Sequence, residues 1–170
     1  MSLMLALVMT LLAPGYLAQN TQATELAQVE PITKKLLEAF RSGDVPAMKP
    51  LFADSVLFVG DLNFLGDAKG SRGQRDVTRD QLASAYTALF NAIGREKWAG
   101  LLKDIKQTLV RATQGGHPDD SKGELPKGFV RPGDYVFQLS LPGSGLDDVI
   151  LFVLRPAAGK WQIVAHWADY

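Results

Sequence analysis

The spacing of apolar residues predicts helices in the first half of the chain and strands in the second. Helical spacing follows Pro31, and a longer amphipathic stripe begins after Thr78, whose hydroxyl can cap the helix. Between them, Asp44 can cap a short helix. Runs rich in β-branched and aromatic residues predict strands over 55–59, 105–113, 135–141, 149–154 and 161–167. The pattern therefore predicts an α+β domain.

The connections between the last three runs predict how those strands pair. Glycine- and proline-containing segments join them, at 142–145 and at 155–160, and these are short enough for an antiparallel meander. Every residue over 149–154 is apolar, so neither face of that strand can lie against water. The helices would cover one face of the sheet. We expect a second copy of the chain to cover the other.

The N-terminus differs from the rest because an apolar run precedes every charged side chain. As a helix, residues 3–13 would span only about 16 Å, against about 30 Å for a membrane core, so a stable membrane span is not expected. Small residues at Ala18 and Ala23 follow, which is typical of a signal peptide. We predict export, with residues 1–23 removed and 24–170 forming the domain. An apolar helix packed on the domain is the alternative.

Composition excludes several classes of function. The chain of 170 residues has 18 Lys+Arg, 18 Asp+Glu and no cysteine. Balanced charge argues against nucleic acid as a partner, and absent cysteine excludes disulfides, thiolate nucleophiles and zinc–thiolate sites. His117 lies beside Asp119 and Asp120 in a segment rich in glycine and proline, without a second histidine, which favours a solvated turn. We predict no metal and no cofactor.

Four segments resemble the nuclear transport factor 2-like (NTF2-like) superfamily, which includes ketosteroid isomerase and the SnoaL-type polyketide cyclases. They are FRSGDVPAM at 40–48, LFAD at 51–54, the helix around Leu82 to Phe90, and GKWQIVAH at 159–166. The resemblance covers roughly residues 30–170. It implies a cone in which N-terminal helices and a long helix pack in a strongly bent antiparallel sheet. It also implies a pocket inside the cone and a homodimer formed through the outer sheet face.

The resemblance does not extend to the residues of ketosteroid isomerase. That enzyme uses an aspartate base together with a tyrosine and a protonated aspartic acid. Alignment on the shared segments places these groups on Gly60, Leu36 and Leu151 of this chain, none of which can act as an acid or a base. Asp61 lies one residue beyond the position of the base and would replace it only if the strand bulges.

His166 is the strongest catalytic candidate. The same alignment puts Val164, His166 and Ala168 on the pocket side of the last strand. It places four residues on the outer side: Trp161, Ile163, Ala165 and Trp167. A histidine can act as a general base near neutral pH, and Asp61 would orient its ring. A core histidine bonded to a neighbouring group is the simpler alternative.

Aromatic and apolar side chains are expected to line the pocket. The predicted ligand-binding residues are Tyr86, Trp98, Leu36, Leu151, Val164 and Tyr135. Core packing explains the same pattern. We therefore expect an exported domain that binds a small apolar or amphipathic molecule. The alternatives are a lyase or isomerase of polyketide-cyclase or dehydratase type that uses His166, and a dimeric protein-interaction module whose cone is filled by its own side chains.

Overall fold

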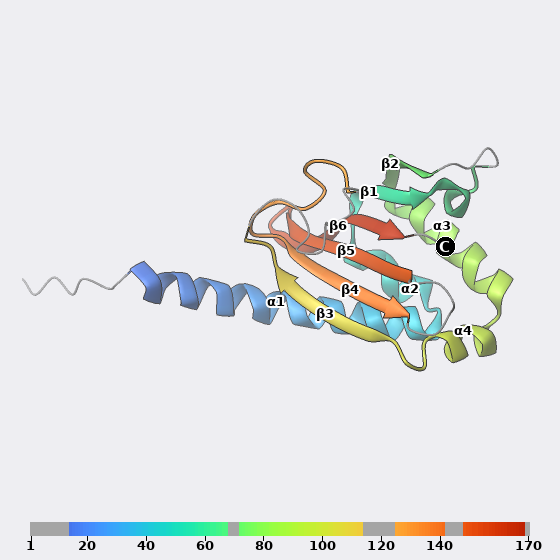
Figure 1. The fold of residues 1–170 in the computed structure, drawn as a ribbon, viewed down its shortest axis with the longest axis horizontal. Coiled ribbons are helices and arrows are strands. Elements are labelled where there is room, and N and C mark those ends of the chain that lie inside the picture. Colours follow the sequence, from blue (N-terminus) through green and yellow to red (C-terminus); the bar gives the residue numbers. More distant parts are fainter. Residues whose placement is uncertain (1–13, 68–71, 114–124, 142–147, 169–170) are drawn as a thin grey trace, which may run out of the picture.

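The computed structural model describes residues 14–67, 72–113, 125–141 and 148–168. They form helices and one six-stranded sheet (Figure 1). The helices are α1 (Pro14–Ser42), α2 (Val45–Met48), α3 (Arg79–Ile93) and α4 (Arg95–Leu101), with 3₁₀ turns η1 (Lys49–Leu51) and η2 (Leu62–Leu65). The strands are β1 (Phe52–Asp61), β2 (Arg72–Thr78), β3 (Lys106–Arg111), β4 (Tyr135–Leu141), β5 (Asp148–Ala157) and β6 (Lys160–Ala168).

Helix α1 begins well before the predicted start. It runs without interruption from Pro14 to Ser42 and contains Pro31, which was expected to open it. Buried residues lie on both sides of the proline, Val29 before it and Leu36 after it, so packing outweighs the local cost of a missing N–H donor. The N-terminal part of α1 extends past the edge of the sheet (Figure 1). No described helix is both long and apolar enough to cross a membrane.

The sheet is mixed rather than wholly antiparallel. Its strand order is β2-β1-β6-β5-β4-β3, and the predicted meander of β4, β5 and β6 is confirmed. The expectation of antiparallel pairing is wrong at one place, because β1 and β6 run parallel. These strands come from opposite ends of the domain, and no turn joins them from which a direction could be predicted. The pairing brings Phe58 beside His166.

Strand β2 was not predicted. Its sequence RGQRDVT is polar and begins within residues 66–73, where three glycines favour a loop. The strand nevertheless pairs antiparallel with β1 over its whole length, and Val77 is buried in the core. An edge strand can have this composition because most of its side chains face water. Polar character therefore did not distinguish it from a loop.

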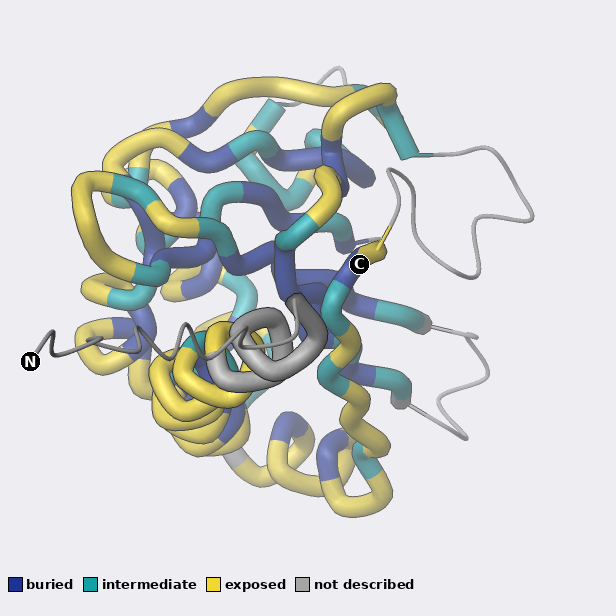
Figure 2. Tube along the Cα trace, turned by 90° about the vertical axis from the view of Figure 1, so that its left-hand side faces the viewer, coloured by how far each residue is buried: buried dark blue, intermediate teal, exposed yellow. Residues whose placement is uncertain are grey.

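The two faces of the sheet carry two separate apolar clusters. The inner cluster contains the buried side chains of α1, α3 and α4 together with those of the sheet that point towards them. The outer cluster joins residues of β1, β4, β5 and β6 to Phe129 and Val130, which lie between β3 and β4. The sheet is therefore mostly buried, whereas α1 is exposed along much of its length (Figure 2). The chain itself supplies cover for the face that was expected to need a second copy, and the homodimer stays a prediction.

A bulge in β6 changes which side chains face inward. Val153 of β5 lies opposite Ala165, but the next pair joins Leu154 to Ile163, so Val164 has no partner across the ladder. Val164 and Ala165 both pack in the outer cluster. One extra residue reverses the alternation of side chains for everything on one side of it.

The predicted side-chain orientations in β6 are correct for the residues that follow the bulge and incorrect for those that precede it. His166 and Ala168 point inward and Ala165 and Trp167 point outward, as expected. Val164 faces outward instead of into the pocket. Trp161 and Ile163 pack in the inner cluster instead of lying on the outer face.

Candidate functional site

A hydrogen-bonded pair, Tyr86 of α3 and His166 of β6, lies inside the fold. Both side chains are buried, and the Tyr86 hydroxyl oxygen lies 2.7 Å from Nε2 of His166. Nδ1 of His166 lies 3.0 Å from the backbone carbonyl oxygen of Leu151. Because a carbonyl can only accept, Nδ1 carries the proton and Nε2 is the acceptor. The Tyr86 hydroxyl therefore donates a hydrogen bond to Nε2 of His166.

Aromatic rings surround the imidazole. The ring of Phe152 stacks on His166 with centroids 4.6 Å apart and an interplanar angle of 5°, and Phe58 lies edge-on at 5.5 Å. Burial among these rings lowers the pKa of His166 to about 4, although the bond to Leu151 acts in the opposite direction. The imidazole is therefore neutral at pH 7.

The start of α3 positions Tyr86. Thr78 and Gln81 form a capping box, in which the Thr78 hydroxyl accepts from the Gln81 amide and the Gln81 side chain accepts from the Thr78 amide. With its first turn fixed, the helix presents Leu82, Tyr86 and Phe90 on one buried stripe, since residues four apart share a face. Both the cap and the stripe were predicted from the sequence and are confirmed.

Asp61 does not meet His166. Its carboxylate accepts a hydrogen bond of 2.9 Å from the amide of Asn63 and so caps the turn η2. The two ring nitrogens of His166 already bind Tyr86 and Leu151. Asp61 is therefore a turn residue that ends the strand.

Gly60 lies at the position expected for the base of ketosteroid isomerase. Its φ is +140°, in the region that favours glycine, and a Cβ at this position would overlap the backbone carbonyl oxygen of Ala168. The close approach follows from the parallel pairing, which places Gly60 beside Ala168. The absence of a side chain here is therefore a requirement of the sheet.

The other predicted ligand-binding residues divide between the two faces. Leu36, Trp98 and Tyr135 belong to the inner cluster. The Trp98 indole donates to the carbonyl oxygen of Phe40 at 2.6 Å, which makes it part of the core. Leu151 and Val164 belong to the outer cluster, so their expected place in the pocket is wrong.

Tyr135 connects the sheet to α1. Its hydroxyl donates to the carbonyl oxygen of Gln22 at 3.4 Å, and its ring meets Trp161 edge-on at 5.4 Å. Burial raises the pKa of this hydroxyl, and the nearby Glu25 carboxylate adds to the effect. Arg111 also donates to Glu25, at 3.0 Å. These contacts hold the part of α1 around Gln22 and Glu25 against the sheet.

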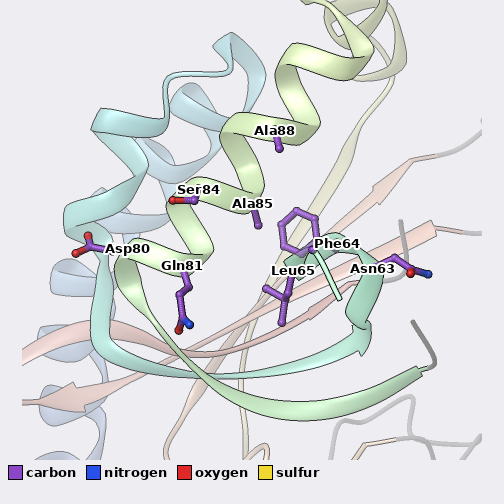
Figure 3. A pocket seen from close by; sticks show the side chains of 9 residues that line it. Asn63, Phe64, Leu65, Asp80, Gln81, Ser84, Ala85 and Ala88 are labelled. Atoms are coloured by element: carbon purple, nitrogen blue, oxygen red, sulfur yellow. The ribbon is translucent and has the colours of Figure 1, made fainter. Parts of the chain in front are cut away.

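A groove of about 460 Å³ lies between η2 and α3 (Figure 3). Helix α3 contributes Asp80, Gln81, Ser84, Ala85 and Ala88, and the segment of η2 contributes Asn63, Phe64, Leu65 and Gly66. The ring of Phe64 meets that of Tyr86 edge-on at 5.0 Å and stacks on Phe58 at 5.5 Å. Phe64 therefore connects the groove to the aromatic surroundings of His166.

None of the residues that line this groove was predicted from the sequence to do so. Phe64 and Leu65, two large apolar residues that come a few positions after the predicted strand 55–59, were the available signal. His117, which the sequence places in a solvated turn without a metal, lies outside the described residues. Within the described ranges, no three His, Asp or Glu side chains lie close enough together to hold a metal ion.

Comparison with known proteins identifies the fold. No family model matches the chain, and no curated protein matches its sequence. Among solved structures, NTF2-like proteins of unknown function from Shewanella baltica OS155 and Shewanella oneidensis MR-1 both align with a TM-score of 0.50. Their identities are 15% and 13%, and the alignments cover 86% of this chain and 94% and 99% of theirs.

A SnoaL-like protein of unknown function from Burkholderia thailandensis E264 aligns with a lower TM-score of 0.47, at 13% identity over 85% of this chain and 95% of that one. The elements described above define an α+β domain with helices on one face of an open sheet. Within that class the chain has the NTF2-like fold, as its sequence predicted. At these identities the likeness concerns the fold, which hosts many functions.

Replacing Tyr86 by phenylalanine tests the buried pair. The variant leaves Nε2 of His166 without its donor in an apolar environment, so we expect the free energy of unfolding to fall by about 1–3 kcal/mol. Tyr135→Phe is the matched control, because it removes a longer bond to a backbone carbonyl and should cost about 1 kcal/mol or less. Urea unfolding of both variants measures the difference. Equal losses would contradict the assigned bond.

The lowered pKa of His166 predicts how it titrates. Between pH 4 and 6.5 the unfolded chain binds a proton that the folded protein does not, so this residue's contribution to stability is lost as the pH falls. The contribution amounts to about 3 kcal/mol over that range. In an NMR titration, the His166 ring signal should stay constant from pH 8 to about 5. His117→Gln assigns the two histidines, and a His166 midpoint near the ordinary value would refute the prediction.

Proposed function

We propose that the protein binds a small apolar or amphipathic molecule in the groove between η2 and α3. The observation that carries this proposal is the size and lining of the groove. Its volume of about 460 Å³ lies in the range of small-molecule sites. Its apolar lining residues are Phe64, Leu65, Ala85 and Ala88, and its polar ones are Asn63, Asp80, Gln81 and Ser84.

The arrangement of these residues favours an amphipathic ligand. Asp80, Gln81 and Ser84 line the groove from α3, and Asn63 lies on the far side of Phe64 and Leu65 from them (Figure 3). Polar groups therefore flank an apolar middle formed by Phe64, Leu65 and Ala85, which suits a molecule with an apolar body and polar ends. The proposed site differs from the cone pocket expected from the sequence, because Phe64 lies between the groove and the Tyr86–His166 pair.

Filling the groove with a large side chain tests the proposal. Ala88 is exposed and lines the groove, so the Ala88→Trp side chain should occupy the groove without disturbing the core. The probe is N-phenyl-1-naphthylamine, a neutral dye whose fluorescence rises in apolar sites. We expect saturable binding to the unaltered protein and roughly tenfold weaker binding to the variant.

Thr87→Trp is the matched control for this titration. Thr87 is also exposed on α3 but does not line the groove, so the dye should bind this variant as it binds the unaltered protein. Circular dichroism verifies that both variants are folded. Dye binding that is unaffected by Ala88→Trp, or dye that does not bind the unaltered protein, would refute the groove as the site.

A second candidate function is proton transfer of the lyase or isomerase type, and the Tyr86–His166 contact is the observation in its favour. A neutral imidazole is the form that a general base requires. Nε2, however, already accepts a hydrogen bond from the Tyr86 hydroxyl, so a substrate would have to take the place of that hydroxyl. Binding without catalysis therefore remains the first proposal.

We also propose that the protein is exported after cleavage at Ala23. Leu26 of α1 packs against the inner cluster and Glu25 pairs with Arg111, so a domain starting at residue 24 retains these contacts. The Tyr135–Gln22 bond would be lost. Intact mass measurement of protein expressed with its own N-terminus should give the mass of residues 24–170. A mass that includes residues 1–23 would refute export by cleavage.

A further inference from the structure

Gln81 of α3 lines the groove and also caps the helix to which it belongs. Its side-chain oxygen accepts a hydrogen bond of 2.8 Å from the backbone amide of Thr78. A backbone amide can only donate, so the atom that faces Thr78 is Oε1, and the remaining end of the side chain is the nitrogen Nε2. The capping box therefore determines which atom of Gln81 the helix holds and which atom it leaves over.

Nε2 of Gln81 carries two hydrogens that the fold does not use. Within the described ranges, the one hydrogen bond of this side chain is the bond that Oε1 accepts from Thr78. Gln81 is exposed and lines the groove together with Phe64 and Leu65 (Figure 3). Both donors of Nε2 are therefore available to a molecule that binds in the groove.

Ser84 adds a second donor on the same side of α3. It follows Gln81 by three residues, so the two side chains share a face of the helix, and both line the groove. An exposed hydroxyl can bond back to its own helix, as that of Thr87 does by donating to the carbonyl oxygen of Ala83 at 2.9 Å. The Ser84 hydroxyl has no such partner among the residues that the structure describes. The groove thus offers neutral donors from two positions on one helix face.

The charges around the groove argue against an anionic ligand. Among the described residues that line it, Asp80 carries a negative charge and none is a lysine or an arginine. Nζ of Lys49 lies 2.6 Å from a carboxylate oxygen of Asp80, and this hydrogen bond and positive charge lower the pKa of Asp80, so the carboxyl group is ionised at pH 7. An anion in the groove would lie near this charge without a cation of its own, whereas a neutral acceptor would not be repelled.

We propose that Gln81 selects the ligand of the groove, and that this ligand is a neutral, largely apolar molecule with a carbonyl oxygen. The carbonyl oxygen accepts hydrogen bonds from Nε2 of Gln81 and from the Ser84 hydroxyl, which its two lone pairs allow. The apolar body of the molecule packs against Phe64 and Leu65. This inference rests on the proposed function, because it concerns the same groove, and it adds the chemistry of the ligand's polar end.

The variant Gln81→Glu separates the two roles of this residue. A glutamate oxygen can still accept from the Thr78 amide, so the capping box remains, but both donors of Nε2 are lost. The probes are 2-acetylnaphthalene and 2-ethylnaphthalene, which differ only in the exchange of a carbonyl for a CH₂ group and which displace N-phenyl-1-naphthylamine from the groove. The preference for the ketone, measured as the ratio of the two dissociation constants, should fall roughly fivefold in the variant. The dissociation constant of the hydrocarbon should not change.

Thr78→Ala is the matched control. It removes the hydroxyl that accepts from the Gln81 backbone amide, but it keeps the Thr78 amide that holds Oε1 of Gln81. This variant should unfold at a lower urea concentration, since the loss of an N-cap weakens the helix, and it should retain the preference for the ketone. Gln81→Met, which also lacks both donors, replaces Gln81→Glu if circular dichroism shows that the latter is unfolded.

Several results would overturn the proposal while leaving the groove as the binding site. An unchanged preference in Gln81→Glu, or an equal loss of ketone and hydrocarbon binding, means that Nε2 does not donate to the carbonyl. A preference that disappears in Thr78→Ala means that it depends on the start of the helix and not on the donor. Tighter binding of 2-naphthoate than of 2-acetylnaphthalene to the unaltered protein means that the ligand is an anion. Dye that does not bind the unaltered protein refutes instead the groove itself, and with it the proposed function.

Discussion

A sheet that is apolar on both faces sets the conditions for the whole molecule. Neither face can remain in contact with water, so each needs its own cover. The helices α1, α3 and α4 cover one face, and aromatic side chains fill the space between them and the sheet. Residues 125–134, which have no regular secondary structure, cover the other face. The two covers differ in kind. The first is continuous with the core, whereas the second consists of Phe129, Val130 and the partly buried Leu125, beside an ion pair between Asp134 and Arg155.

The same constraint explains the polar pair at the centre. A histidine placed among phenylalanine rings must find partners for both nitrogens, because an unsatisfied polar atom in an apolar interior is costly. Leu151 and Tyr86 supply them, and no described buried side-chain nitrogen or oxygen lacks a hydrogen-bond partner. His166 therefore fits first as a component of a satisfied core. The groove beside Phe64 is the more accessible feature for a ligand.

Local signals in the sequence predicted the local structure well. The Thr78 cap, the stripe through Tyr86 and the antiparallel meander all depend on residues close together in the chain. The missed features depend on distant contacts. Pairing of β1 beside β6 set the parallel direction, the bulge at Val164 shifted the alternation by one residue, and packing carried α1 through Pro31. The ring of His166 could be placed inward, but its partners came from segments that the sequence does not relate.

Gly60 limits the reactions that this fold can acquire in this chain. The pairing of β1 with β6 brings the carbonyl of Ala168 into the space that any side chain at residue 60 would need. A carboxylate at the position used by ketosteroid isomerase would require β6 to shift first, so one codon change cannot install it. The hydrogen bonding of the strands thus separates this chain from that branch of enzyme chemistry by at least two coordinated changes.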